Sequence, residues 1–300
     1  MITLTASLTA LYVIPRTIIL DRLIGVNGAI TFSGIITPVL GVFLAPSYGI
    51  LAVFIGTMIA AFIPGSAGTL KFGGLDFLGG ALNVALISLL VRGRRTEATF
   101  MYLATLGLFV INPNTEIFVG SNFPNLPVPF QWFRLPSPPI PYLWLHLIAL
   151  GVLVSPLTRN LGNIFIRGTR RQLAKAVLVA AFIGTMLEHA MGGILFASLF
   201  GSVAQRSWPF IFLVYPVERG VLVLGAVLVC TPLLSASRDL IARFHLREVK
   251  QDSRFRPSLQ WRAGDSIRSD PARGCIRFTP EARPALLEKA HVDIQMHCRL

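Results

Sequence analysis

Two stretches of the sequence place ionisable side chains inside apolar runs, where they could bind a polar ligand or hold a proton. Glu218 and Arg219 are adjacent in YPVERGVLVL, and Glu188 and His189 are adjacent in TMLEHAMGGILFA. An ionised side chain at the centre of a membrane helix costs about 2.5–3.5 kcal/mol, so such residues face protein or water and are paired. These four residues are the first candidates for a substrate-binding site.

The adjacent Glu218 and Arg219 can be interpreted in two ways. Neighbouring residues of a helix point about 100° apart, so we expect these two side chains to meet different partners. In the functional interpretation, Arg219 contacts an acidic group of a ligand in a pocket. In the structural interpretation, both residues belong to an ion-pair network that locks helices together.

Glu188 and His189 lie near the middle of a long apolar stretch and are followed by glycines, which let a neighbouring helix pack closely. A buried Glu beside a His can hold a proton, coordinate a cation or hydrogen-bond a polar ligand. The alternative is a satisfied interior pair. Their spacing differs from HExxH, so metalloprotease chemistry is not supported. Asn83, inside another apolar stretch, could hydrogen-bond a ligand or a neighbouring helix.

The motifs of several enzyme classes are absent from the sequence. It contains no GxxxxGKS or GxxxxGKT phosphate loop and no GxSxG elbow, and Cys230, Cys275 and Cys298 show no CxxC spacing. We therefore expect no enzymatic activity, no cofactor and no metal site. One alternative is a polytopic membrane enzyme that uses Glu188 or His189 as acid or base on a lipid-soluble substrate.

The composition indicates the elements that must position these residues. Of the 300 residues, 53% are hydrophobic and only 14% are charged, whereas about a quarter of a soluble protein is charged. Apolar stretches near the roughly 20 residues needed to cross a bilayer recur along the chain. We predict an all-α, polytopic transmembrane bundle of about eight spans, at residues 2–20, 29–45, 47–64, 73–92, 98–117, 140–157, 173–200 and 209–236.

Basic clusters predict the orientation of these spans. They lie at residues 92–95, at 159–171 and from Arg238 onward, and Lys and Arg are enriched in cytoplasmic loops. We expect a multi-pass protein of the cell membrane with both termini in the cytoplasm. The proline-rich residues 122–141 would then lie on the outer face, as an extended lid or as a connector.

The C-terminal part of the chain has a different composition from the rest. We predict a transmembrane helical domain over residues 1–237 and a basic, disordered cytoplasmic tail over residues 238–300, which is polar and rich in Arg and Pro. The formal net charge of +13 is explained by this tail and by the span ends, where Arg favours anionic membrane lipid. It does not indicate a nucleic-acid-binding protein.

Small residues begin the first apolar stretch, where Ala6 and Ala10 form an AxxxA pattern on one helix face. Such patterns let two membrane helices approach closely. Together with the following LYVI and the later ITFSGIITPVLGVFLAPSYGILAVFIGTMIAAF, the sequence resembles the substrate-binding S component of energy-coupling factor (ECF) vitamin transporters. The resemblance is best over residues 2–92 and returns over 173–236. The two spans between residues 98 and 157 and the long tail depart from the family's usual six helices.

The resemblance implies a membrane-embedded subunit that binds a small, vitamin-like molecule for uptake. A transmembrane T component would dock on Ala6 and Ala10, and separate ATPase subunits would supply energy. The substrate-binding residues would be Arg219, Glu218, Glu188, His189 and Asn83. The other alternative to this function is a non-catalytic membrane scaffold whose tail binds lipid or a partner.

Overall fold

A computed structural model of the protein describes residues 2–22, 29–64, 70, 72–120, 137–238, 267–270 and 275–278. The chain divides into two compact units, residues 1–242 and 243–300. Most of the predicted lid and tail lies outside the described residues, so the disorder of the tail stays a prediction.

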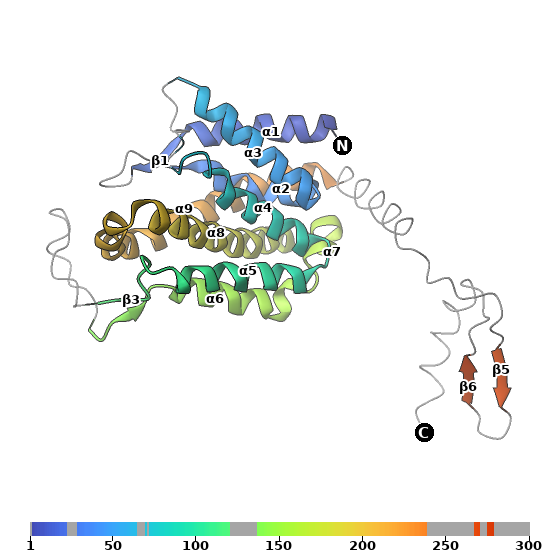
Figure 1. Ribbon diagram of the computed structural model, residues 1–300. Coiled ribbons are helices and arrows are strands. Elements are labelled where there is room, and N and C mark those ends of the chain that lie inside the picture. The colour runs from blue at the N-terminus through green and yellow to red at the C-terminus, as the bar shows by residue number, and fades with distance from the viewer. Residues whose placement is uncertain are drawn as a thin grey trace. The chain divides into compact units, whose positions relative to one another are not determined.

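The described part of the first unit is mostly helical (Figure 1). It contains two 3₁₀ turns, η1 (Phe32–Ile35) and η3 (Pro156–Thr158). Its α-helices are α1 (Ile2–Thr17), α2 (Thr37–Phe43), α3 (Pro46–Phe62), α4 (Phe77–Val91), α5 (Arg95–Ile111), α6 (Trp144–Val154), α7 (Leu161–Arg167), α8 (Arg170–Phe200) and α9 (Ser202–Ala236).

Short antiparallel pairs of strands accompany the helices. In the first unit, β1 (Ile19–Arg22) pairs with β2 (Ala29–Thr31), and β3 (Phe118–Val119) pairs with β4 (Ile140–Pro141). In the second unit, β5 (Ile267–Asp270) pairs with β6 (Cys275–Phe278).

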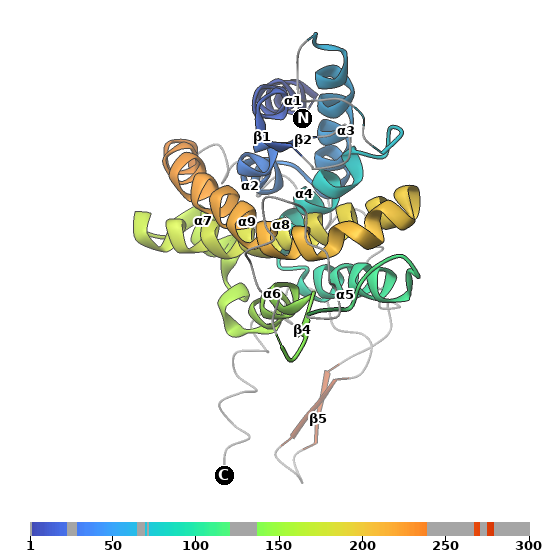
Figure 2. The same ribbon diagram turned by 90° about the vertical axis from the view of Figure 1, so that its left-hand side faces the viewer.

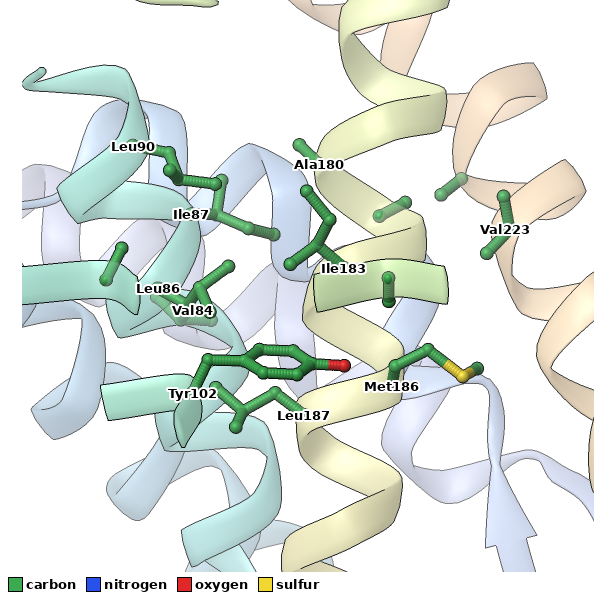
Figure 3. Packing of buried hydrophobic residues seen from close by; sticks show 14 of the residues in the cluster. Val84, Leu86, Ile87, Leu90, Tyr102, Ala180, Ile183, Met186, Leu187 and Val223 are labelled. Carbon is green, nitrogen blue, oxygen red and sulfur yellow. The ribbon is translucent and has the colours of Figure 1, made fainter. Parts of the chain in front are cut away.

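The helices of the first unit form a layered bundle (Figures 1 and 2). The pair α1 and α3 lies on one side, α8 and α9 cross the middle, and α5 and α6 lie on the opposite side. Helix α4 packs against both α3 and α8 and so joins the first layer to the middle. Side chains of α4 and α8 meet in the core shown in Figure 3, which includes Val84, Ile87, Ile183 and Leu187.

Local sequence features determine where α8 begins and where it is separated from α9. Thr169 begins α8 with a capping box, in which its hydroxyl accepts from the backbone N–H of Gln172 and the Gln172 side chain accepts from the backbone of Thr169. Gly201 separates the two helices with φ of +46°, a conformation that favours glycine. The chain therefore reverses in one residue and packs α9 along α8.

Two helices of the described part, α8 and α9, are long and apolar enough to cross a membrane. The structure differs from the span prediction at residues 29–45, which form β2, η1 and α2, and at residues 140–157, which form β4, α6 and η3, in place of continuous helices. It also forms a short helix, α7, inside the basic cluster at residues 159–171.

The two ends of the bundle differ in character. Figure 1 shows the N-terminus and α7 at one end and β1 and β3 at the other; we call these the basic end and the hairpin end. At the basic end, the Arg95 guanidinium donates to the carbonyls of Leu153 and Ser155 at 3.0 and 2.8 Å. This arginine therefore ties the start of α5 to the end of α6, and the clusters at residues 92–95 and 159–171 gather at the same end.

Apolar side chains cover much of the exterior of this unit as well as forming its core. Large apolar side chains point outward from several helices, among them Phe62, Phe100 and Leu228, which are 83%, 74% and 75% exposed. In contrast, Asn83 and His146 are completely buried. Extended apolar surface of this kind marks contact with a membrane or another protein.

Candidate functional site

A cavity of about 150 Å³ lies in the half of the bundle toward the hairpin end. It is lined by the end of α1, β2, the start of α4, and facing stretches of α8 and α9. By volume it could hold on the order of ten water molecules or one small organic molecule. Its charged and imidazole lining groups are Arg16, Asp76, Glu188, His189, Glu218 and Arg219.

Four of the five predicted substrate-binding residues, Glu188, His189, Glu218 and Arg219, thus line one cavity. The fifth, Asn83, lies behind Glu188, to which its amide Nδ2 donates at 2.7 Å. This contact between α4 and α8 requires Gly184, since a Cβ at that position would lie 2.0 Å from Asn83 Oδ1. Whether these residues bind substrate stays a prediction.

Glu218 and Arg219 lie at the middle of α9, because the helix begins at Ser202 and not at residue 209 as predicted. The expectation that they meet different partners is wrong, because Arg219 Nη2 donates to Glu218 Oε1. Both side chains have enough rotatable bonds to bend toward each other from adjacent positions. A second guanidinium nitrogen, Nη1, donates to the Thr185 carbonyl on α8 at 3.5 Å.

A histidine that sequence reasoning missed supports the site from behind. His146 on α6 is fully buried, and its Nε2 lies 3.1 Å from His189 Nδ1. This contact fixes the ring of His189 and leaves its Nε2 without a partner among the described residues. The signal was present in YLWLHLIAL, where a lone histidine interrupts an apolar stretch.

Aromatic rings form one wall of the cavity. The ring of His189 stacks on Tyr215 with centroids 4.7 Å apart, and Tyr142 lies 5.5 Å from Tyr215. Tyr215 Oη donates to the Tyr142 carbonyl at 3.0 Å and holds α9 to the segment before α6. Trp208 meets Tyr142 edge to face at 5.0 Å, so the wall is rigid and mostly apolar.

The remaining charged lining groups lie near the hairpin end. Arg16 Nη1 donates to Thr31 Oγ1 at 3.3 Å, and Asp76 Oδ2 accepts from the backbone N–H of Phe72 at 2.9 Å. Within the described ranges, no group of three or more His, Cys, Asp or Glu side chains could hold a metal ion. The arrangement can bind a small polar molecule by charge and hydrogen bonds on one side and by ring contact on the other.

The predicted partner surface lies on a different face. Ala6 and Ala10 are exposed on α1, whereas Thr5, Thr9 and Tyr12 are buried. The buried face packs against α3, where Gly56 makes room for the Tyr12 ring. Ala6 and Ala10 therefore make no core contact within this unit and are accessible to another helix.

No protein-family model matches the chain, and comparisons with curated proteins and with solved structures gave no match.

Proposed function

We propose that the protein is a multi-pass cell-membrane subunit that binds a small polar, vitamin-like molecule for uptake. The observation that carries the proposal is the cavity itself, in which Glu188, His189, Glu218 and Arg219 converge inside a bundle with an apolar exterior. Charged residues within membrane bundles face one another or a polar cavity and mark substrate pathways.

The position of the cavity supports capture from outside the cell. The basic clusters gather at one end of the bundle, which the bias of Lys and Arg toward cytoplasmic loops makes the inner end. The cavity lies toward the opposite end, near β1 and β2. In this proposal the shorter helices also lie within the bilayer, around the two long helices α8 and α9.

The proposed energy source is external to the chain. The exposed Ala6 and Ala10 on α1 would contact a transmembrane T component, which ATPase subunits drive. Small residues suit this contact because they allow two helix backbones to pack closely in lipid. Membrane lipid would cover the remaining apolar surface.

The test compares small molecules released from purified wild-type protein and from Gly192→Leu, using mass spectrometry after denaturation. Gly192 lines the cavity, and a Cβ built there meets nothing within 4 Å. A leucine would therefore occupy ligand space without displacing the fold. We expect a specific small molecule from the wild type and at least a tenfold smaller amount, roughly, from the variant.

Gly107→Leu is the matched control, because Gly107 is exposed on α5 and its Cβ position is equally open. This variant should retain the molecule in full. If all three proteins release the same molecules in the same amounts, the cavity is not the binding site and the proposal fails.

A further inference from the structure

We infer that the cavity selects a positively charged, planar ring compound, whose cationic group binds Glu188. The inference rests on the proposed function and names its substrate class.

Carboxyl groups outnumber guanidinium groups on the cavity lining. Three carboxyl groups and two guanidinium groups line it: Asp76, Glu188, Glu218, Arg16 and Arg219. Arg219 is already paired with Glu218, and Asp76 accepts a backbone N–H. The lining therefore carries one carboxyl group more than guanidinium groups, and among the described residues no basic side chain forms an ion pair with Glu188.

Glu188 has one hydrogen-bond partner and no cationic partner among the described residues. Among the described residues, Asn83 alone hydrogen-bonds to it, through Oε2, and no basic side chain forms an ion pair with it. Asn83 fixes one carboxylate oxygen and leaves Oε1 for the cavity. A carboxylate inside a membrane bundle is costly without a positive partner, and a cationic ligand would supply that partner.

Aromatic rings line the same cavity as this carboxylate. Glu188 is followed directly by His189, whose ring belongs to the stack with Tyr215 and Tyr142. Flat aromatic faces attract both planar rings and cations. Arg16 also lies on the lining, at the end of α1 and hydrogen-bonded to Thr31; a cationic ligand is repelled by this guanidinium and attracted by the Glu188 carboxylate.

Three probes of the same ring and nearly the same size separate charge from shape: benzylammonium, benzyl alcohol and benzoate. Their dissociation constants are measured by isothermal titration on the purified full-length protein in detergent. We expect benzylammonium to bind wild type at least about tenfold more tightly than benzyl alcohol, and benzoate to bind most weakly. In Glu188→Gln, benzylammonium should lose about tenfold in affinity while benzyl alcohol changes by less than about threefold.

Glu97→Gln is the matched control, because Glu97 forms an exposed ion pair with Arg94 at the start of α5. It should leave all three affinities unchanged. Benzoate binding as tightly as benzylammonium in the wild type overturns the inference without use of any variant, and leaves the proposed binding function standing. Binding of none of the three also overturns it, and the released-molecule comparison then decides the proposed function separately.

Discussion

At the scale of single residues, the site depends on how buried charges are satisfied. Glu218 and Arg219 are each 7% exposed and share one ion pair. Breaking a buried pair by removing one partner costs far more than replacing both partners. Glu188 differs from this pair, because it has an amide partner and no positively charged partner among the described residues.

Arg219→Ala should destabilise the protein by about 3–5 kcal/mol, because Glu218 then loses its cation in a buried environment. The double variant Glu218→Leu/Arg219→Met should lose much less, since no charge stays behind. Denaturant unfolding of the purified protein in detergent measures both. Equal losses in the two variants would show that the ion pair does not stabilise the bundle.

At the scale of elements, helix packing places the polar groups. Helix α8 is the common element, because it packs against α4, α5, α6 and α9 and carries Glu188 and His189. Gly184, one turn before Glu188, allows α4 to approach where Asn83 reaches the carboxylate. Small residues therefore determine the position of the polar contact.

Gly184→Ala should lower the thermal unfolding temperature, because the added methyl group collides with Asn83 and forces α4 away from α8. Overpacking of this kind costs about 1–3 kcal/mol. Gly107→Ala adds the same methyl group at an open position on α5 and should leave the stability unchanged or slightly increased. An unchanged unfolding temperature for Gly184→Ala would mean that the α4–α8 contact relaxes freely.

At the scale of the whole molecule, the exposed apolar side chains are suited to contact with lipid or another protein. The exposed face of α1 carries small residues that suit contact with another helix. Ala6 and Ala10 are small exposed residues, whereas α3 exposes large apolar side chains, among them Phe54, Ile59 and Phe62. A lipid-facing surface does not require small residues, whereas close helix contact does.

Ala6→Leu/Ala10→Leu should abolish recovery of a T component and ATPase subunits when the tagged protein is isolated in mild detergent. Leucine side chains would keep the partner backbone at a distance. Ala104→Leu, on the exposed face of α5, is the control and should retain the partners. Mass spectrometry of the captured proteins gives the result. Identical partners in all three samples would move the contact away from α1.

The sequence alone predicted the helical character and most of the helix positions, because continuous apolar stretches make helices the only elements that satisfy their backbone in an apolar environment. It also predicted that Glu188, His189, Glu218 and Arg219 face protein or water, since an ionised side chain is costly in lipid. Residues 29–45 form β2, η1 and α2. Their apolar character did not predict this division, because an apolar stretch can form a strand, a turn or a helix.

Only the tertiary structure decided which polar groups meet. The pairing of Glu218 with Arg219 depends on side-chain rotamers, and the contact of His146 with His189 depends on the packing of α6 against α8. The Asn83–Glu188 hydrogen bond joins residues 105 positions apart and requires the space left by Gly184. The pattern of residues along one segment indicates which of its side chains are buried. Which other segment those side chains contact depends on how all the helices pack together.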